Sequence, residues 1–156
     1  MSQLDVRLAE LGIEIPDVAK PVAAYVPAVA SGRLVFTSGQ LPFIDGGLPE
    51  TGKVGDGPGL VSPDKAKQYA RLCVLNALAA AKSVIGDLDR VVRVIKVTGF
   101  VASAPDFTGQ PMVINGASET LAEIFEDAGQ HARSAIGVAV LPLDAPVEVE
   151  LVLEFE

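Results

Sequence analysis

The chain has 156 residues, of which 49% are hydrophobic, and it carries a formal net charge of −8 at pH 7. This length is typical of one domain that buries roughly 70% of its unfolded-chain surface, and the hydrophobic fraction excludes a disordered chain. The 20 acidic residues outnumber 12 scattered basic residues, which argues against a nucleic-acid-binding protein. We therefore expect residues 1–156 to form a single domain that begins with a helix and connector at 1–20.

The cysteine and histidine content excludes two kinds of site. Cys73 is the one cysteine, so an internal disulfide is excluded, and with His131 as the one histidine we expect no metal site. The N-terminus lacks the basic and apolar regions of a signal peptide, and no apolar stretch approaches the ~20 residues of a membrane span. The sequence therefore predicts a soluble, cytoplasmic protein.

The first predicted elements are short. Ser2 to Leu11 has leucines at helical spacing and Gly12 as a stop, which predicts a helix. Ala24 to Ala30 and Leu34 to Gln40 are rich in β-formers around a Ser-Gly turn, which predicts a hairpin. The glycine-rich stretch 45–60 predicts an exposed loop or a weak edge strand.

Two longer helices and two apolar strands follow. Ser62 as N-cap before a proline predicts a helix that ends at Gly86, and a second helix is predicted from near Gln110 to Ala128. Strands are predicted at Val91–Ala102 and Ser134–Leu141. Because the helices separate these strands from each other and from the strand that starts at Leu34, we expect the three strands to be parallel.

The last strand, from Val147, alternates apolar residues with glutamates. The turn before it contains two prolines and is not a tight hairpin turn, so we expect this strand to insert elsewhere in the sheet. Same-face glutamates about 6.7 Å apart repel by roughly 2.5 kcal/mol at an effective dielectric near 20. If the glutamate face is buried, it needs a partner, and we interpret Arg133 as a guanidinium offered to that same face. A second copy of the chain is the simplest cover for it.

Several motifs together resemble the RidA (YjgF) family, from about Tyr25 to the C-terminus. They are Thr37-Ser38-Gly39-Gln40, the helix from Ser62, Thr98-Gly99-Phe100-Val101, and Ala132-Arg133-Ser134 followed by Leu141-Pro142 and Val147-Glu148-Val149-Glu150. The chain is most similar to the longer branch, with an extra N-terminal helix and His131 where better-studied members have proline. The resemblance implies an α+β (α/β), chorismate-mutase-like fold with a six-stranded mixed sheet and two main helices on one face. It also implies a homotrimer with clefts between its subunits.

The same resemblance implies an activity without a cofactor, the hydrolysis of reactive 2-imino or enamine acids to 2-keto acids and ammonia. Arg133 matches the arginine that binds the substrate carboxylate, and Glu148 matches the glutamate that positions the attacking water. Ala135 stands where the family uses a backbone carbonyl. The remaining matches to the pocket are Tyr25, Ser38, Gly39 and Asn115.

Other interpretations stay open at this level. The same arginine would serve a non-catalytic protein that binds small carboxylates, such as keto acids or amino acids. An endoribonuclease is a label that some family members carry, although the acidic charge argues against it. Residue by residue, Arg133 could form a structural ion pair, Glu148 could be a solvated strand glutamate, and Tyr25 a packed aromatic. Ser38 and Gly39 could be turn residues, Asn115 a helix-surface amide, and His131 a loop residue.

Overall fold

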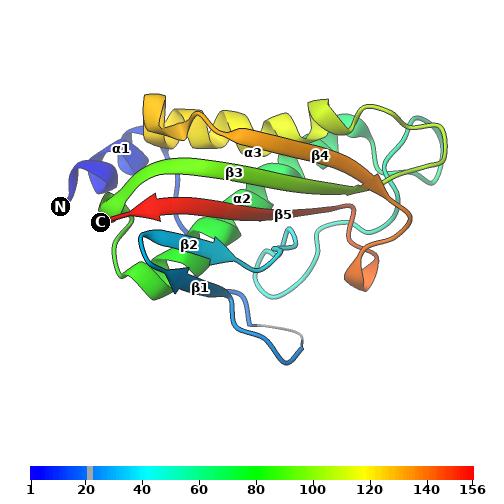
Figure 1. The fold of residues 1–156 in the computed structure, drawn as a ribbon. Helices are drawn as coiled ribbons and strands as arrows, with labels where there is room; N and C mark the ends of the chain where they lie inside the picture. The colour runs from blue at the N-terminus through cyan, green and yellow to red at the C-terminus, as the bar shows by residue number, and fades with distance from the viewer. Residues whose placement is uncertain (21–22) are drawn as a thin grey trace.

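A mixed sheet with helices on one face forms the fold (Figure 1). The computed structural model describes residues 1–20 and 23–156. The strands are β1 (Ala28–Ser31), β2 (Leu34–Thr37), β3 (Val91–Ala102), β4 (Ala132–Val138) and β5 (Val147–Phe155). The helices are α1 (Gln3–Leu11), α2 (Pro63–Ile85) and α3 (Gln110–Phe125), with 3-10 turns η1 (Leu88–Arg90), η2 (Glu126–Gly129) and η3 (Pro142–Asp144). In this described part of the chain, no helix is both long and apolar enough to cross a membrane.

The strand order is β1-β2-β5-β3-β4. β5 lies antiparallel between β2 and β3, while β3 and β4 pair in parallel. The predicted insertion of the last strand is therefore confirmed, and β2, β3 and β4 run in one direction as predicted. The predicted sixth strand is wrong for the described residues, which form five. Residues 45–60 contribute only isolated bridges, such as those of Val54 with Val61 and Ser103.

The helix termini follow the capping residues. Ser62 Oγ accepts a hydrogen bond from the Lys65 N–H at 3.3 Å at the start of α2, and the Gly86 N–H donates to the Lys82 carbonyl at 2.8 Å at its end. These contacts satisfy backbone groups that have no partner within the helix. α3 ends at Phe125, earlier than predicted, because Glu126 adopts φ 53° and the chain continues as η2.

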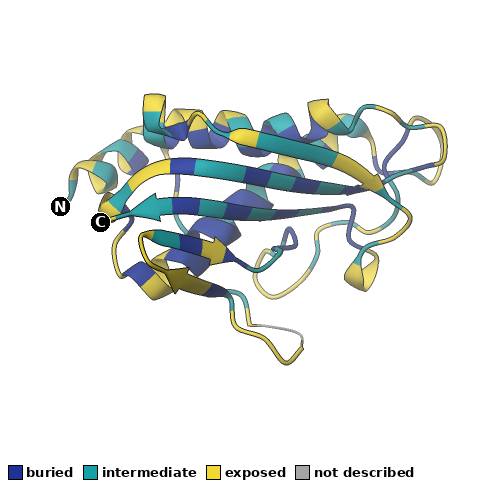
Figure 2. Cartoon of the chain, in the orientation of Figure 1, coloured by how far each residue is buried: buried dark blue, intermediate teal, exposed yellow. Residues whose placement is uncertain are grey.

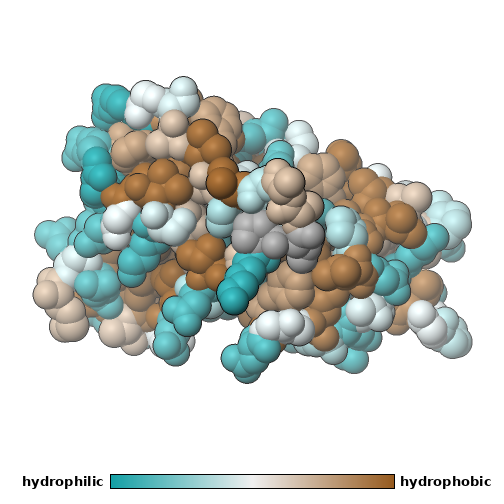
Figure 3. Space-filling view, turned by 90° about the horizontal axis from the view of Figure 1, so that it is seen from below, coloured by the Kyte–Doolittle hydropathy of each residue, from teal (hydrophilic) through white to brown (hydrophobic). Residues whose placement is uncertain are grey.

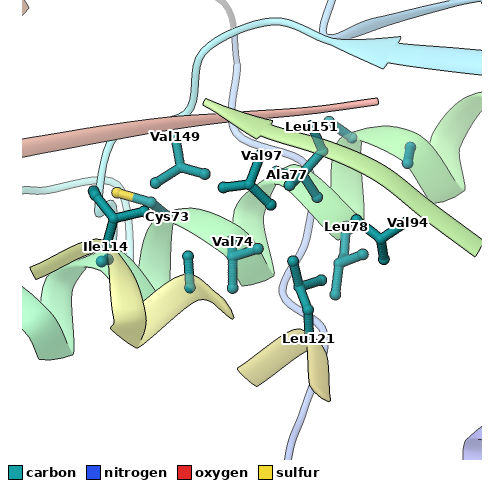
Figure 4. Close-up of a cluster of buried hydrophobic side chains, with 14 of the residues drawn as sticks. Cys73, Val74, Ala77, Leu78, Val94, Val97, Ile114, Leu121, Val149 and Leu151 are labelled. Atoms are coloured by element: carbon teal, nitrogen blue, oxygen red, sulfur yellow. The ribbon is translucent and has the colours of Figure 1, made fainter. Parts of the chain in front are cut away.

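The core lies between the sheet and the two long helices (Figures 2 and 4). Small residues of α2, among them Ala70, Ala77 and Ala81, are fully buried and allow the helix to approach β5 closely. Cys73 belongs to this core, where burial raises the pKa of its thiol well above the ordinary value. Cys73 is therefore a packed thiol rather than a nucleophile, as the alanine-rich helix face indicates.

Candidate active site

Arg133 lies near the start of β4 and is half-buried. Its Nη1 donates to Asn115 Oδ1 at 2.8 Å and to Ser118 Oγ at 3.2 Å. Asn115 and Ser118 are three residues apart on α3, a spacing that places both side chains on one face of the helix. No carboxylate of the described residues comes within 4.0 Å of the guanidinium in an ion pair. The Nη1 edge is thus held by neutral acceptors, and Nε and Nη2 remain for a ligand.

The expectation that Arg133 shares a sheet face with the glutamates is wrong. Arg133 is in register with Val97, which is fully buried under the helices, whereas Glu148 is in register with Phe100. Successive side chains of a strand point to opposite faces, so the guanidinium lies on the helix side and the carboxylate on the other side. An ion pair between Arg133 and Glu148 of one chain is therefore excluded by the pleat of the sheet.

Glu148 forms the second feature of the site, at the β2–β5 contact. Its Oε1 lies against Gly39, so closely that a methyl group at residue 39 would collide with it. Burial raises the pKa of the Glu148 carboxyl, and the neighbouring carboxylate of Glu150 raises it further. The electrostatic cost predicted for this row is thus present, and it makes Glu148 a stronger proton acceptor than a solvated glutamate.

A β-bulge positions Ser38 and Gly39 beside Glu148. Four residue steps lead from Phe36 to Gln40, whereas three lead from Val152 to Val149 on the paired strand. The extra residue interrupts the pairing, so β2 ends at Thr37, three residues before the predicted end. It also changes the direction of the chain after Thr37. Ser38 Oγ donates to the Val26 carbonyl at 2.6 Å, which ties the segment before β1 to the bulge.

Tyr25 precedes β1 and is 45% exposed. The predicted strand from Ala24 begins only at Ala28, so Tyr25 lies in a loop. It lines a small hollow together with Gly39. The face of the molecule seen from below carries hydrophobic and hydrophilic residues side by side (Figure 3). A separate hollow of about 950 Å³ lies between residues 14–20, 43–46 and α2, and none of the predicted site residues lines it.

The predicted site residues therefore form two groups in one chain. Arg133 and Ala135 lie on the helix side of β4, where Asn115 of α3 accepts a hydrogen bond from Arg133, and Ala135 is in register with Gly99. The other group lies at the β2–β5 contact and comprises Tyr25, Ser38, Gly39 and Glu148. β3 separates the two groups in the sheet, so one copy of the chain does not bring them into one cavity.

Comparison with known proteins identifies the fold family. The model of a protein family described as "YjgF/chorismate_mutase-like, putative endoribonuclease" matches residues 5–155. The chain belongs to the YjgF/RidA family. Its fold is accordingly the α+β, chorismate-mutase-like fold that the motifs predict.

Three relatives illustrate the range of the family. "Protein TCP17" of Trypanosoma cruzi is 43% identical over 149 residues, which cover 95% of this chain and 91% of that protein. The crystal structure of Atu1372 from Agrobacterium tumefaciens, a protein described as having unknown function, superposes with a TM-score of 0.88 at 42% identity. That match covers 98% of this chain and 92% of the other.

The third relative carries a functional name. "Putative reactive intermediate deaminase TdcF" of Escherichia coli K12 is 32% identical over 136 residues, which cover 84% of this chain and 86% of that protein. A crystal structure of E. coli TdcF with bound serine matches with a TM-score of 0.64 at 25% identity, and the match covers 89% of this chain and 94% of that one.

Two residues of this YjgF/RidA member complete the Arg133 group and were not predicted for the site. Ser118 Oγ lies 2.9 Å from His131 Nε2 and accepts from Arg133, and His131 Nδ1 lies 2.7 Å from the Gly129 carbonyl. The signal for Ser118 was its spacing of three residues from Asn115 on the helix that leads to Arg133. His131 was recognised only by its place two residues before the arginine.

Proposed function

We propose that the protein hydrolyses reactive 2-imino and enamine acids to 2-keto acids and ammonia, at a site shared between copies of the chain. The proposal rests on the hydrogen bonding of Arg133, whose guanidinium is held at Nη1 by Asn115 and Ser118. The edge formed by Nε and Nη2 matches a carboxylate, which a guanidinium binds through two parallel hydrogen bonds. The name and bound serine of TdcF support a small amino-acid-like substrate.

Glu148 supplies the acceptor for the water in this proposal. The water oxygen adds to the C=N carbon while one of its protons passes to the Glu148 carboxylate, and the imine nitrogen takes up a proton from solvent, which gives a carbinolamine. Glu148 then returns its proton to the nitrogen, the C–N bond breaks and ammonia leaves, while the carbinolamine hydroxyl loses its proton to solvent and the C=O bond of the keto acid forms. Because burial and Glu150 raise the pKa of Glu148, its carboxylate accepts this proton more readily than a solvated one. Holding water and imine together supplies most of the remaining acceleration.

Assembly is required because Arg133 and Glu148 face opposite sides of one sheet. The side without helices carries exposed apolar residues: Val29, Phe36 and Ile136 are 54%, 44% and 46% exposed (Figure 2). A half-apolar sheet face of this kind is normally covered by another layer. We place a second copy there, in a homotrimer whose clefts each combine the Arg133 group of one copy with the Glu148 group of its neighbour.

The first test is release of a 2-keto acid from an imino acid generated in the assay by an amino-acid oxidase. Wild-type protein should accelerate release, and Arg133→Ala should lose the acceleration while its circular dichroism stays unchanged. Arg33→Ala is the matched control, because the Arg33 side chain lies at the surface and forms an ion pair with Glu154 there. Full activity of a folded Arg133→Ala protein would refute the proposal.

The second test asks whether each site contains residues of two copies. Arg133→Ala and Glu148→Gln proteins are each expected to be inactive, and their subunits are mixed by co-expression. In a mixed cyclic trimer one of three clefts regains both residues, so random mixing should restore about a quarter of wild-type activity. No restoration in trimers that contain both variants would contradict the shared cleft. Light scattering should give about three times the 16.2 kDa of the chain.

Two further outcomes would replace the proposed activity. Binding of a 2-keto acid without acceleration of imine hydrolysis would make the protein a small-carboxylate binder that uses the same arginine. RNA cleavage that disappears with Arg133→Ala would favour the endoribonuclease that the family description names. The net charge of −8 opposes RNA, since phosphate binding depends on clustered lysine and arginine.

A further inference from the structure

We infer that Ser118 and His131 are positioning residues that hold the Arg133 guanidinium in one orientation, so that it presents a single edge to a carboxylate. The inference rests on the proposed role of Arg133 as carboxylate anchor. It concerns a chain of hydrogen bonds that runs from the Gly129 carbonyl through His131 and Ser118 to Arg133.

The backbone carbonyl of Gly129 determines which atom donates and which accepts in each of these hydrogen bonds. His131 Nδ1 lies 2.7 Å from the Gly129 carbonyl oxygen, which only accepts hydrogen bonds, so Nδ1 carries the proton. In the neutral ring Nε2 is then an acceptor. It lies 2.9 Å from Ser118 Oγ, which therefore donates its hydroxyl proton to the ring.

The hydroxyl orientation in turn frees a lone pair for the arginine. A serine hydroxyl has one proton, and with that proton directed at His131 the oxygen accepts from Arg133 Nη1 at 3.2 Å. The other Nη1 hydrogen goes to Asn115 Oδ1 at 2.8 Å. Both hydrogens of Nη1 are thus engaged, which opposes rotation of the guanidinium plane.

The arrangement ties three elements together. Ser118 belongs to α3, His131 follows the η2 turn, and Arg133 lies on β4. Gly129, which supplies the fixed carbonyl, is buried and packs so closely on the Leu121 carbonyl that a methyl group there would collide with it. The origin of the hydrogen-bond chain is therefore a rigid point, and an anchor that is held in advance loses less entropy when it binds a ligand.

A purely structural role for His131 predicts different effects of substitution than a role in orienting Arg133. If His131 only closed the turn after α3, its Nδ1 donor would matter and its Nε2 acceptor would not. His131→Asn keeps a donor near the Nδ1 position, His131→Gln keeps an acceptor near the Nε2 position, and His131→Leu keeps neither. Ser118→Ala and Ser118→Thr form the matching pair on the helix, one without and one with the hydroxyl.

The first measurement is rotation about the Arg133 Nε–Cζ bond, followed by nitrogen NMR of arginine-labelled protein. Restricted rotation is expected in wild type, His131→Gln and Ser118→Thr, and faster rotation in Ser118→Ala, His131→Leu and His131→Asn. Unchanged rotation in both Ser118→Ala and His131→Leu would overturn the inference. Restriction retained in His131→Asn but lost in His131→Gln would also overturn it, because the donor alone would then matter.

The second measurement is the affinity for pyruvate, the simplest 2-keto acid, by calorimetry. Loss of the hydrogen bonds through His131 and Ser118 should weaken pyruvate binding and raise KM by about 10-fold, with kcat little changed. Because both residues act through the same hydrogen bonds, adding His131→Leu to Ser118→Ala should cause no further loss of affinity. If pyruvate binds but no imine is hydrolysed, the proposed function fails and the inference stands. If rotation and affinity are both unaffected while hydrolysis proceeds, the inference fails and the proposed function stands.

Discussion

The carboxylate of Glu148 occupies the space beside Gly39 that a side chain at residue 39 would fill. Glycine at this position therefore lets the β5 carboxylate lie flat on the β-bulge that ends β2. The two residues come from segments far apart in the sequence, and their contact determines where the acceptor atom of Glu148 lies. A change at residue 39 should consequently act on the carboxylate and not on the fold.

We expect Gly39→Ala to displace Oε1 of Glu148 and to lower kcat by on the order of 100-fold, because small misplacements of reacting groups have effects of this size. The free energy of unfolding should change by less than about 1 kcal/mol, since the obstructing atom is the end of a flexible side chain. Keto-acid release and urea denaturation measure the two effects. Gly47→Ala is the control, because an added methyl there meets only the Ile44 carbonyl at 4.0 Å. Wild-type activity of Gly39→Ala would contradict the assigned position of Glu148.

The raised pKa of Glu148 predicts a dependence of stability on pH. The folded chain holds this proton more tightly than the unfolded chain, because burial and Glu150 disfavour the charged carboxylate. The Glu148 contribution to the free energy of unfolding is therefore greatest below its ordinary pKa of 4.5, and falls as pH rises towards the raised folded value. Glu148→Gln should be increasingly stable relative to wild type from pH 4 to pH 7, as measured by urea denaturation.

Glu150→Gln is the informative companion to that variant. It removes the second cause of the shift and leaves burial, so the pH-dependent loss of stability should shrink without disappearing. A wild-type protein whose stability difference from Glu148→Gln is the same at pH 4 and pH 7 would show that Glu148 titrates normally.

The sequence predicts the helices well because their ends are local. Ser62 and Gly86 act on neighbouring backbone groups, so their residue types alone indicate where α2 begins and ends. The strand ends are less predictable, because they depend on partners. β2 stops at Thr37 where the bulge opens against β5, and segment 45–60 makes bridges instead of a sixth strand.

The orientation of Arg133 is the part of the site that sequence reasoning could not supply. The stretch from Ala132 to Val138 has no clean alternation of apolar and polar residues, so it does not indicate which residues face the helices. The register with the buried Val97 decides the matter, and register is set by pairing with β3. β5 alternates regularly, so the face of Glu148 could be read from the sequence.

Gly116 tests the contact between α2 and α3. It lies so close to the Lys67 carbonyl of α2 that a methyl group would collide with backbone. Alanine is favoured over glycine in a helix by about 1 kcal/mol, but overpacking a contact of this kind destabilises by about 1–3 kcal/mol. We therefore expect Gly116→Ala to lower the free energy of unfolding by up to about 2 kcal/mol, the net of these two effects.

The reciprocal change on the exposed side of α3 is the control for Gly116→Ala. Ala122 is exposed, so Ala122→Gly should lower stability by about 1 kcal/mol through helix propensity alone. Both variants are compared by thermal and urea denaturation. A stabilising Gly116→Ala would mean that α2 and α3 separate without cost, and that the close contact does not determine their packing.

Tyr69 of α2 binds the glycine-rich segment 45–60, and this contact can be tested by spectroscopy. Its hydroxyl donates to Glu50 Oε2 at 2.7 Å, and burial together with this carboxylate raises the pKa of Tyr69 to about 12. The folded chain therefore keeps the phenol proton more tightly, and stability falls as pH rises from the ordinary value of 10 to about 12.

The absorbance titration of wild type minus Tyr69→Phe should show a midpoint near 12. Glu50→Gln should lower that midpoint only part of the way to 10, because burial is the larger cause. A midpoint at 10 in wild type would show that the segment does not rest on α2 in solution.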